Sequence, residues 1–271
     1  MSRNIGVIGF GNIAKAIITP LLESKLIKPE QIYCLVKTKK SYVNIKNNYK
    51  YKVNIYHENS EDAYSVWECP LKILSVKPQQ LNLIKELNPS GINKNKIIVS
   101  ILAGVSIQKL EKNFPNHFCV RAVTNIPITI GKGLTGISYS SHVKQSQKEF
   151  IKKIFESSSK IYEFEEDYLD IFLALTSSAP AIVSLIVEAL SDGGLSGGLQ
   201  KNLSEELVLE MMLGTVLLLM DTRISTNDLK NMVTSPGGTT ISALRVLEKR
   251  SFRSALIESI IEATKRSKEF R

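Results

Sequence analysis

Short apolar runs separated by segments of helical periodicity fill the first part of the chain. Four of these runs predict strands, at residues 5–9, 31–36, 71–76 and 96–102. Between the first two, residues 12–24 carry apolar side chains at helical spacing and predict a helix. Strands that alternate with helices in this way indicate a mostly parallel sheet covered by helices on both faces.

After about residue 165 the pattern changes to long helical segments, at residues 167–175, 179–190, 204–220 and 239–250. In and beside the third of them, the apolar surface is wider than one packing stripe, and it comprises Leu203, Leu207, Met211, Val216 and Leu219. A helix of that kind is buried on several sides, and one small helical domain offers it few partners. We therefore expect a homodimer or larger homo-oligomer, the alternative being a monomer whose own bundle covers the helix.

A glycine loop, GFGNIA at residues 9–14, lies between the first predicted strand and the first predicted helix. It matches the G-x-G-x-x-G/A dinucleotide fingerprint in the required strand–turn–helix context. Gly9 permits the tight turn, Gly11 lets the backbone approach a pyrophosphate, and Ala14 keeps the helix close to the strand. The phosphates would meet free N–H groups and the positive end of the helix dipole. A chance glycine pair after a strand is the alternative.

The fold class predicted is therefore an α/β N-terminal Rossmann domain, doubly wound around a mostly parallel sheet, over residues 1–164. An all-α C-terminal domain for substrate binding and dimerisation follows over residues 165–271. The end of the second strand favours NADPH over NADH, because an acid that would hold the ribose of NAD is missing there. Residues 36–40 (VKTKK) instead offer a hydroxyl and three ammonium groups to a 2′-phosphate. A solvated lysine face without a ligand is the alternative.

Composition changes this interpretation little. The formal net charge of +9 could indicate a nucleic-acid surface, but the lysines are spread along the 271 residues without a nucleic-acid motif, so we expect anionic small molecules and no nucleic acid. The longest apolar stretch, residues 207–220, contains Glu210 and is shorter than the ~20 residues of a membrane span. Without a secretory signal pattern either, the chain is expected in the cytoplasm and not in a membrane.

Cysteine and histidine usage predicts neither a disulfide framework nor a metal site. Cys34, Cys69 and Cys119 are far apart and form no C-x-x-C pair, so we expect buried thiols. The three histidines have no partner at a metal-binding spacing, and no nucleophile elbow is present. Metal and covalent catalysis are therefore not expected.

A second glycine-rich segment, VTSPGGTT at residues 233–240, precedes an amphipathic helical pattern. A helix start of this kind exposes backbone N–H groups and hydroxyls, which suit a carboxylate. A structural turn capped by threonine is the alternative. From residue 229 to residue 248 (LKNMVTSPGGTTISALRVLE) the chain resembles the C-terminal signature of pyrroline-5-carboxylate reductases, and residues 251–253 (SFR) and 263–267 (ATKRS) continue it.

The resemblance extends over residues 5–270. Residues 75–79 (SVKPQ) resemble the family's segment beside the nicotinamide, and Ala103, Gly104, Arg121 and Asn125 fall in the family's order. The resemblance implies reduction of 1-pyrroline-5-carboxylate to L-proline, in proline biosynthesis, by hydride transfer from NADPH to the C=N carbon. It also implies these cofactor contacts: Gly9, Phe10, Gly11, Asn12, Ile13, Ala14, Lys37, Thr38, Ser75, Val76, Lys77, Pro78, Ala103 and Gly104.

The resemblance further assigns the substrate site. It places five residues around the substrate: Ser178, Ser235, Gly238, Thr239 and Thr240. The hydroxyl of Thr240 is expected near the ring nitrogen as a catalytic group, and Glu166 matches an acidic position near the same nitrogen. Three adjacent acids at residues 165–167 are, as the alternative, plain complements of a helix dipole.

Two segments depart from the family's usual pattern. The chain has SSAP at residues 177–180 where the family has Gly-Ser-Gly-Pro, and VTNIP at residues 123–127 where the family has Met-Pro-Asn-Thr-Pro. A Cβ in place of glycine is tolerated only where φ is negative. Two other functions therefore stay open, a paralogous reductase of another imine and a non-catalytic NADP-binding regulatory protein.

Overall fold

The computed structural model describes residues 4–87 and 96–270, and its chain divides into two compact units. The first unit consists of Met1–Ser177 together with Ala263–Arg271, and the second consists of Ser178–Glu262. The domain boundary expected between residues 164 and 165 falls inside the first unit. The outer ends of the two expected domains, residues 1 and 271, lie outside the described residues.

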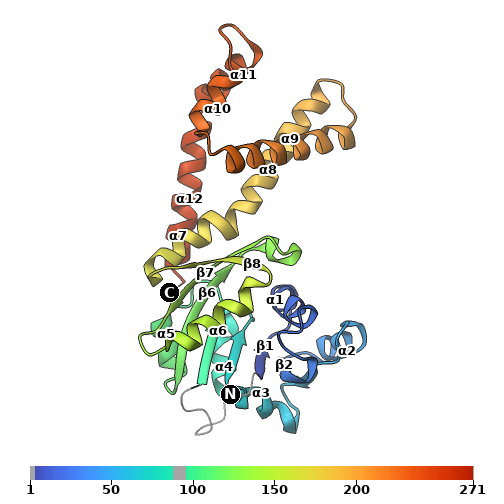
Figure 1. Ribbon diagram of the computed structural model, residues 1–271, viewed down its shortest axis with the longest axis vertical. Coiled ribbons are helices and arrows are strands. Elements are labelled where there is room, and N and C mark those ends of the chain that lie inside the picture. The colour runs from blue at the N-terminus through green and yellow to red at the C-terminus, as the bar shows by residue number, and fades with distance from the viewer. Residues whose placement is uncertain (1–3, 88–95, 271) are drawn as a thin grey trace. The chain divides into compact units, whose positions relative to one another are not determined.

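One sheet forms the centre of the first unit, with the strand order β3-β2-β1-β4-β5-β6-β7-β8 among the described residues (Figure 1). The strands are β1 (Ile5–Ile8), β2 (Ile32–Val36), β3 (Asn54–His57), β4 (Leu71–Leu74), β5 (Lys96–Ser100), β6 (His117–Thr124), β7 (Gly133–Tyr139) and β8 (Ser159–Glu163). Every neighbouring pair is parallel except β6 with β7. The order of the first six strands is that of doubly wound dinucleotide-binding folds, which confirms the predicted fold class.

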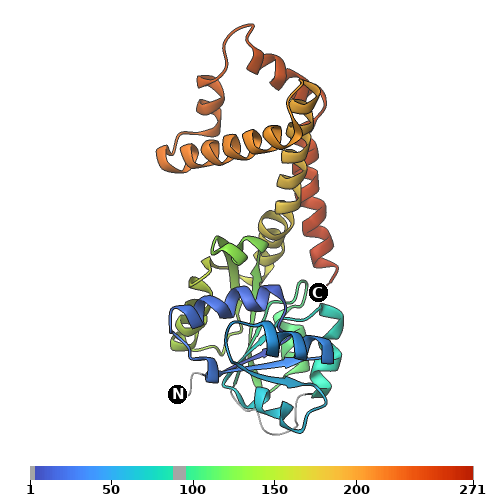
Figure 2. The same ribbon diagram turned by 90° about the vertical axis from the view of Figure 1, so that its right-hand side faces the viewer.

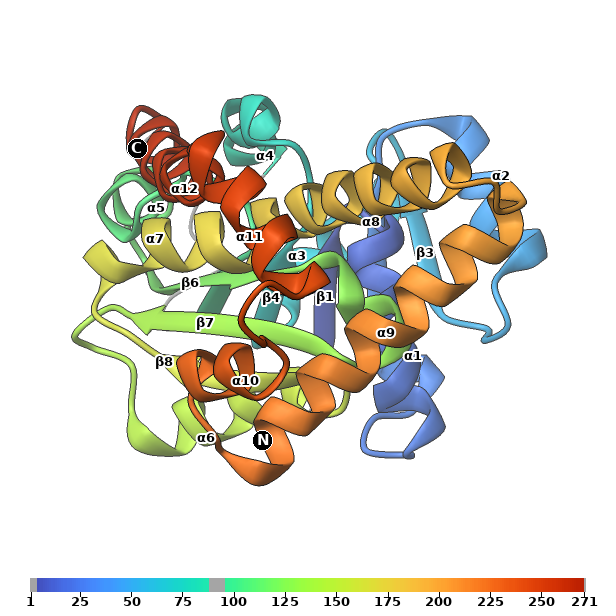
Figure 3. The ribbon, with the colours of Figure 1, turned by 90° about the horizontal axis from the view of Figure 1, so that it is seen from above.

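Helices cover both faces of this sheet, as the alternating pattern predicts (Figure 3). One apolar cluster contains residues of α1 (Asn12–Glu23), α2 (Lys39–Asn48) and α6 (Gln145–Glu156). A second cluster on the other face contains residues of α3 (Ser65–Glu68), α4 (Leu81–Leu87) and α5 (Ile107–Asn113). Short 3₁₀ turns connect some of these elements, at Pro29–Gln31, Glu61–Tyr64, Pro78–Gln80, Ile126–Ile130 and Glu166–Tyr168. The first unit therefore encloses a hydrophobic core of its own.

This core also contains ionisable groups. Lys72, in the central strand β4, is fully buried, and its Nζ lies 3.5 Å from Nε2 of His117. Burial and the nearby Lys96 lower the pKa of Lys72 to about 7, and burial together with Lys72 lowers the pKa of His117 to about 4. None of the ion pairs within residues 4–87 and 96–270 includes Lys72. The core thus contains an amine that is costly to protonate.

All three cysteines are buried free thiols, as expected. Burial raises the pKa of each thiol, most strongly at Cys34. They are therefore packing residues of the first unit.

The second unit is helical. Its elements are α8 (Ala179–Ser196), α9 (Lys201–Thr222), α10 (Thr226–Met232), α11 (Thr239–Lys249) and most of α12 (Phe252–Lys268), whose last turns belong to the first unit. The chain enters α8 from α7 (Leu169–Leu173) through a π-helical turn at Ala174–Ser178. Helices α8 and α9 approach closely where they are joined, because the Ser204 hydroxyl donates to the Ser191 carbonyl over 2.7 Å and a side chain on Gly194 would collide with Ser204.

Apolar side chains of the second unit remain exposed within this chain. Only Ser191 and Ser204 are buried in residues 178–262, and both are polar. Leu207, Met211 and Val216 on α9 are each 51% exposed. Figure 2 shows α9 as a long helix that extends away from α8. The helix predicted over residues 204–220 is therefore confirmed, but the chain itself leaves its wide apolar surface uncovered.

The helical stretch Glu166–Ser196 is long and apolar enough, by length and composition alone, to cross a membrane, with 17% of its most apolar window buried. Serine, threonine and proline residues interrupt the apolar side chains of this stretch, so its uninterrupted apolar runs are short. A single stretch of this kind is a weak indication of a membrane. Exposed apolar side chains are also what a helix shows when a second polypeptide covers it.

Candidate functional site

A cleft of about 820 Å³ lies at the carboxyl ends of strands in the first unit. It is bordered by the loops that follow β1, β2 and β4, where the strand order reverses and dinucleotides bind in folds of this class. Ten of the residues expected to bind the cofactor line this one cleft: Gly9, Phe10, Gly11, Asn12, Ile13, Lys37, Thr38, Ser75, Val76 and Lys77. Residues from three separate loops therefore converge as the sequence predicts.

The two glycines of the loop at residues 9–14 have different tasks. Gly9 has φ of 85°, and a side chain on it would collide with the carbonyl oxygen of Ser75. Gly11 has φ of −82° and open space around the position of a Cβ. The fold therefore requires glycine at position 9, whereas the space beside Gly11 is available to a ligand.

Helix α1 begins directly after Gly11, and no side chain among the described residues caps its first N–H groups. Such free donors at the positive end of a helix suit a pyrophosphate. Ala14 does not line the cleft but is buried between α1 and the sheet. The residues present thus fit the phosphates of a dinucleotide.

The loop after β2 forms the wall of the cleft where the adenosine end of a dinucleotide is expected. Thr38 caps α2, because the N–H of Ser41 donates to its hydroxyl oxygen over 3.1 Å and that hydroxyl donates to Ser41 Oγ over 2.8 Å. Lys37 lines the cleft, but Lys39 and Lys40 line a separate depression on α2. One lysine and two hydroxyl side chains of this loop, and not three lysines, therefore line the cleft.

Sequence reasoning missed several residues of the cleft. They include Ser41, Glu58, Gln80, Ile101, Thr124 and Ile126. The spacing of Thr38 and Ser41 is that of a helix cap, and Ile101 directly follows the predicted strand β5, so the same rules could have found Ser41 and Ile101. Pro78, Ala103 and Gly104 do not line the cleft.

The second predicted site, at residues 235–240, is the loop before α11 in the second unit. Gly237 has φ of 70°, which suits glycine, and the N–H of Gly238 donates to the Ser235 carbonyl over 3.0 Å. Thr239 and Thr240 open α11, and no side chain among the described residues caps its first turn. Ser235 and Thr239 are exposed and Thr240 is half-buried. Free N–H groups beside hydroxyls form a receptor for a carboxylate.

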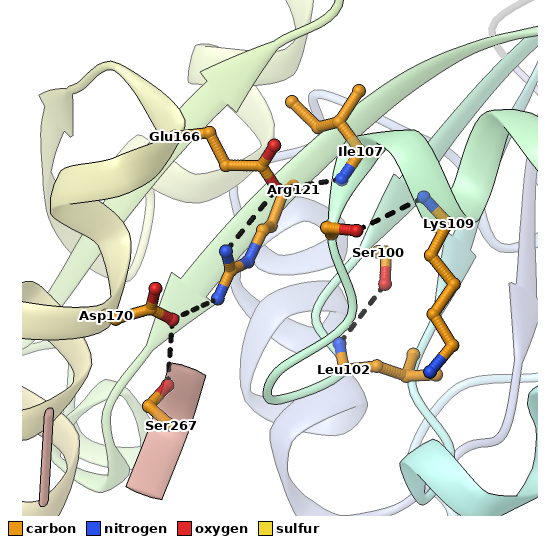
Figure 4. Close-up of polar contacts among 9 residues, drawn as sticks. Ser100, Leu102, Ile107, Lys109, Arg121, Glu166, Asp170 and Ser267 are labelled. Carbon is orange, nitrogen blue, oxygen red and sulfur yellow. Dashed lines mark hydrogen bonds and ion pairs between the residues drawn. The ribbon is translucent and has the colours of Figure 1, made fainter. Parts of the chain in front are cut away.

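The other two predicted residues lie elsewhere. Ser178 is the first residue of the second unit and precedes α8. Glu166, in the first unit, uses its Oε1 to accept the backbone N–H of Ile107 at 2.7 Å and Nη1 of Arg121 at 3.4 Å (Figure 4). The carboxylate of Glu166 is thus engaged with groups of its own unit.

Comparison with known proteins identifies the family. Residues 166–270 match the family model for pyrroline-5-carboxylate reductase dimerisation, and residues 4–104 match the model for NADP oxidoreductase, coenzyme F420-dependent. A pyrroline-5-carboxylate reductase from Synechocystis sp. is 37% identical over 269 residues, which are 99% of this chain and 98% of that protein. The chain belongs to the pyrroline-5-carboxylate reductase family.

Solved structures of this family have the same fold. The pyrroline-5-carboxylate reductase of Coxiella burnetii matches with a TM-score of 0.85 and 29% identity, over 100% of this chain and 99% of that one. The pyrroline carboxylate reductase of Plasmodium falciparum, solved with NADP bound, matches with a TM-score of 0.83 and 28% identity, over 98% of this chain and 97% of that one. The similarity therefore covers both units.

The two segments in which this chain departs from the usual pattern of pyrroline-5-carboxylate reductases touch each other. The Ser177 hydroxyl donates to the Thr124 carbonyl over 2.9 Å, and the Asn125 amide donates to the Thr176 carbonyl over 3.2 Å. Ser177 and Ala179 stand where the family has glycine, and positive φ among non-glycine residues in the described part of the chain is confined to Lys25, Arg223 and Ser251. The condition for replacing the family's glycines by serine and alanine is therefore met.

Proposed function

We propose that this member of the pyrroline-5-carboxylate reductase family reduces 1-pyrroline-5-carboxylate to L-proline with NADPH, in the cytoplasm, as a homodimer or larger homo-oligomer. The observation that carries the proposal is full-length similarity to named reductases, 37% identity over 99% of the chain, with the glycine cleft and the loop before α11 both present. Small molecules, and not nucleic acid, are its ligands in this proposal.

The cleft supports NADPH as the cofactor, with NADH as the weaker ligand. The N–H groups at the start of α1 would hold the pyrophosphate, and Lys37 with Thr38 would hold the 2′-phosphate. Phe10, Asn12, Ile13, Ser75, Val76 and Lys77 would form the remaining walls. When bound, NADPH supplies the hydride that adds to the C=N carbon of the substrate.

The loop before α11 is proposed to hold the substrate by its carboxylate. The N–H groups of Thr239 and Thr240 and the hydroxyl of Ser235 would donate to the carboxylate oxygens, while Gly238, without a Cβ, leaves room for the Ser235 hydroxyl. The Thr240 hydroxyl would lie at the ring nitrogen, which must be protonated for the carbon to be electrophilic. Holding two reactants close to contact can remove roughly 7–11 kcal/mol of barrier, so orientation is the main contribution of these residues.

Self-association is supported by the match of residues 166–270 to the dimerisation model and by the exposed apolar side chains of the second unit. A single long helix such as α9 leaves Leu207, Met211 and Val216 half exposed, which is unfavourable in water unless another chain covers them. A homodimer would bury this surface. We propose no partner other than a copy of the chain.

The proposal is tested by oxidation of NADPH with 1-pyrroline-5-carboxylate, followed by the variant Thr240→Ala. Loss of one hydrogen bond to a charged group should cost about 1.5–3 kcal/mol, or roughly ten- to a hundredfold in kcat/KM. Thermal unfolding should change only modestly and NADPH binding should not change. Ser254→Ala is the matched control, because its hydroxyl donates to the Glu258 carboxylate over 2.8 Å within α12 and not to the loop before α11, so this variant should turn over substrate like the unaltered protein.

Other outcomes separate the alternatives. Turnover with another cyclic imine but not with 1-pyrroline-5-carboxylate would indicate a paralogous reductase. NADPH binding without turnover of any imine would indicate a regulatory protein. Undiminished turnover in Thr240→Ala would assign that hydroxyl to the helix start alone.

A further inference from the structure

Arg121, in β6, is fully buried in the first unit, and two carboxylates reach its guanidinium (Figure 4). Its Nη2 lies 2.8 Å from Oδ1 of Asp170, and its Nη1 lies 3.4 Å from Oε1 of Glu166. Glu166 and Asp170 are four residues apart on consecutive helical turns, so their side chains project from one face. Because a buried charge without partners is costly, these contacts hold the segment 166–170 against β6.

Each carboxylate also binds a third segment of the first unit. Glu166 Oε1 accepts the backbone N–H of Ile107, at the end of the loop that follows β5. Asp170 Oδ1 accepts the hydroxyl of Ser267, in the last turn of α12, over 2.8 Å. One guanidinium thus connects three places that are distant in the sequence, as Figure 4 shows.

The loop after β5 is held a second time in its middle. Gly104 has φ of 69°, and a side chain on it would collide with Phe270, so Phe270 packs directly on the backbone there. At the start of the loop the N–H of Leu102 donates to Ser100 Oγ over 3.3 Å. The loop therefore has little freedom to move while the end of α12 stays in place.

Both segments connected by Arg121 continue into the walls of the cofactor cleft. Ile101 follows β5 and lines the cleft, and Thr124 lies at the end of β6, three residues after Arg121, and lines it too. In doubly wound folds the carboxyl ends of the second half of the sheet face the nicotinamide half of the dinucleotide. A shift of either segment would change the shape of that end of the cleft.

We propose that Arg121, Glu166 and Asp170 form a positioning assembly that fixes the segments after β5 and β6 at the nicotinamide end of the cleft. Glu166 then serves hydride transfer through this placement and not by giving a proton to the substrate. Its Oε1 is already the acceptor for an amide and a guanidinium, which is the contact set of a structural carboxylate. The effect of this assembly on catalysis rests on the proposed function, whereas its effect on the position of the two segments does not.

Three substitutions test the assembly at different points: Ser267→Ala, Asp170→Asn and Glu166→Gln. The first removes one hydroxyl donor, and the other two keep an oxygen acceptor while removing the charge. Ser259→Ala is the matched control, because Ser259 lies in α12 and its hydroxyl donates only to the Leu256 carbonyl of the same helix. For each protein we would measure backbone amide exchange of residues 101–107, the Kd for NADPH, and kcat and KM for 1-pyrroline-5-carboxylate.

All three substitutions should speed exchange in residues 101–107, while Ser259→Ala does not. We expect kcat to fall about three- to tenfold in Ser267→Ala and up to roughly a hundredfold in Glu166→Gln and Asp170→Asn. KM should stay nearly constant and the Kd for NADPH should change by less than about twofold, because the phosphates bind at α1. A purely structural contact would change stability without this selective loss of kcat.

The proposal is overturned if Glu166→Gln alone lowers kcat while Ser267→Ala and Asp170→Asn match the control, because Glu166 would then act on the substrate directly. It is equally overturned if amide exchange in residues 101–107 is the same in all four variants. If the unaltered protein does not turn over 1-pyrroline-5-carboxylate, the proposed function fails, but the exchange measurement still decides the structural role. If Asp170→Asn does not fold, Ser267→Ala and Glu166→Gln give the same decision.

Discussion

The first unit buries its large apolar side chains within itself, whereas the second leaves most of its own exposed. In the first unit, Ile17, Leu21 and Phe155 are fully buried on one face of the sheet, and Trp67 and Phe114 are buried on the other. In the second unit the only buried side chains are Ser191 and Ser204. Similar apolar side chains thus occur in both units, but only the first has layers of its own that cover them.

This difference separates two kinds of stability. A sheet with helices on both faces completes its core from one chain, so the first unit depends on local packing and on the few polar groups that it buries. Long helices without a second layer depend on whatever covers them, so the stability of the second unit is tied to association. The proposed cofactor cleft depends on the first kind of stability, since every residue that lines it lies in the first unit.

The largest effect is expected from Gly9→Ala compared with Gly11→Ala, two residues apart in the first unit. At Gly9 a methyl group meets positive φ and the Ser75 carbonyl, which together should destabilise the unit by about 2–5 kcal/mol. At Gly11 the methyl group enters open space, so unfolding should be unchanged while NADPH binding weakens at least about tenfold, through lost approach of the pyrophosphate. Thermal unfolding measures the loss of stability, and NADPH titration measures the loss of cofactor affinity. Equal thermal stability of the two variants would contradict this prediction.

The second unit should respond instead through association. Leu207→Lys places an ammonium in the surface that we expect a partner chain to cover, and losing a buried leucine costs about 1.5–3 kcal/mol, or tenfold to more than a hundredfold in dimer Kd. Sedimentation at several concentrations measures it. Val43→Lys, at an apolar side chain 45% exposed on α2, is the control and should leave association unchanged. If the dissociated Leu207→Lys chain no longer bound NADPH, cofactor binding by the first unit would depend on association, which contradicts the comparison of the two units.

Within the first unit, Lys72 should make stability depend on pH. Its folded pKa of about 7 lies below the ordinary lysine value of 10.5, so the cost of protonating it in the core is full below pH 7 and disappears as pH rises toward 10.5. Stability should therefore rise between pH 7 and pH 9 by at most about 1.4 kcal/mol per pH unit. Lys72→Met should be more stable than the unaltered protein at pH 6 and should lose this slope, whereas Lys85→Met, an exposed change, should keep it. Denaturant unfolding at several pH values tests the pair.

The smallest effect concerns cofactor preference. Lys37→Asp puts a like charge beside the proposed position of the 2′-phosphate. The ratio of NADPH to NADH affinity should shift by roughly tenfold, which is the size expected from one or two exposed charge pairs. Titration of both cofactors measures it. Lys39→Asp is the matched control, because Lys39 lines the depression on α2 and not the cleft. An equal shift in both variants would mean that net charge, and not contact, sets the preference.

Strands and helices whose apolar residues follow one regular period could be predicted from the sequence. Elements in which a residue that makes a tertiary contact interrupts this apolar pattern could not. β1, β2, β4 and β5 are short, mainly apolar runs and match the predicted strands. β6 was not predicted, because Arg121 in its middle is typical of a surface; its partners Glu166 and Asp170 come 45 and 49 residues later. β7 contains Gly133 and Gly136, which are poor strand formers on local preference.

The candidate site divides in the same way. The glycine loop and the loop before α11 are local features, and the sequence predicts the helix starts that they form. The role of Glu166 depends on Ile107 and Arg121, which lie 59 and 45 residues away in sequence, so no local pattern could reveal its contacts. Helix α8 likewise continues past the predicted end at Leu190, through the usual helix breakers Gly193 and Gly194, and at Gly194 the missing side chain permits the close approach of Ser204 of α9.

The return of residues 263–270 to the first unit makes the second unit an insertion within the first. During synthesis the strands of the sheet therefore emerge before the segment that carries Ser267 and Phe270, so the contacts of Asp170 and Gly104 with that segment form later. Until that segment is synthesised, the nascent chain can form the sheet but lacks the contacts of Ser267 and Phe270. Maturation of the first unit is thus tied to the synthesis of residues 263–270, and a chain stopped within α12 before Ser267 would carry a sheet that lacks these two contacts.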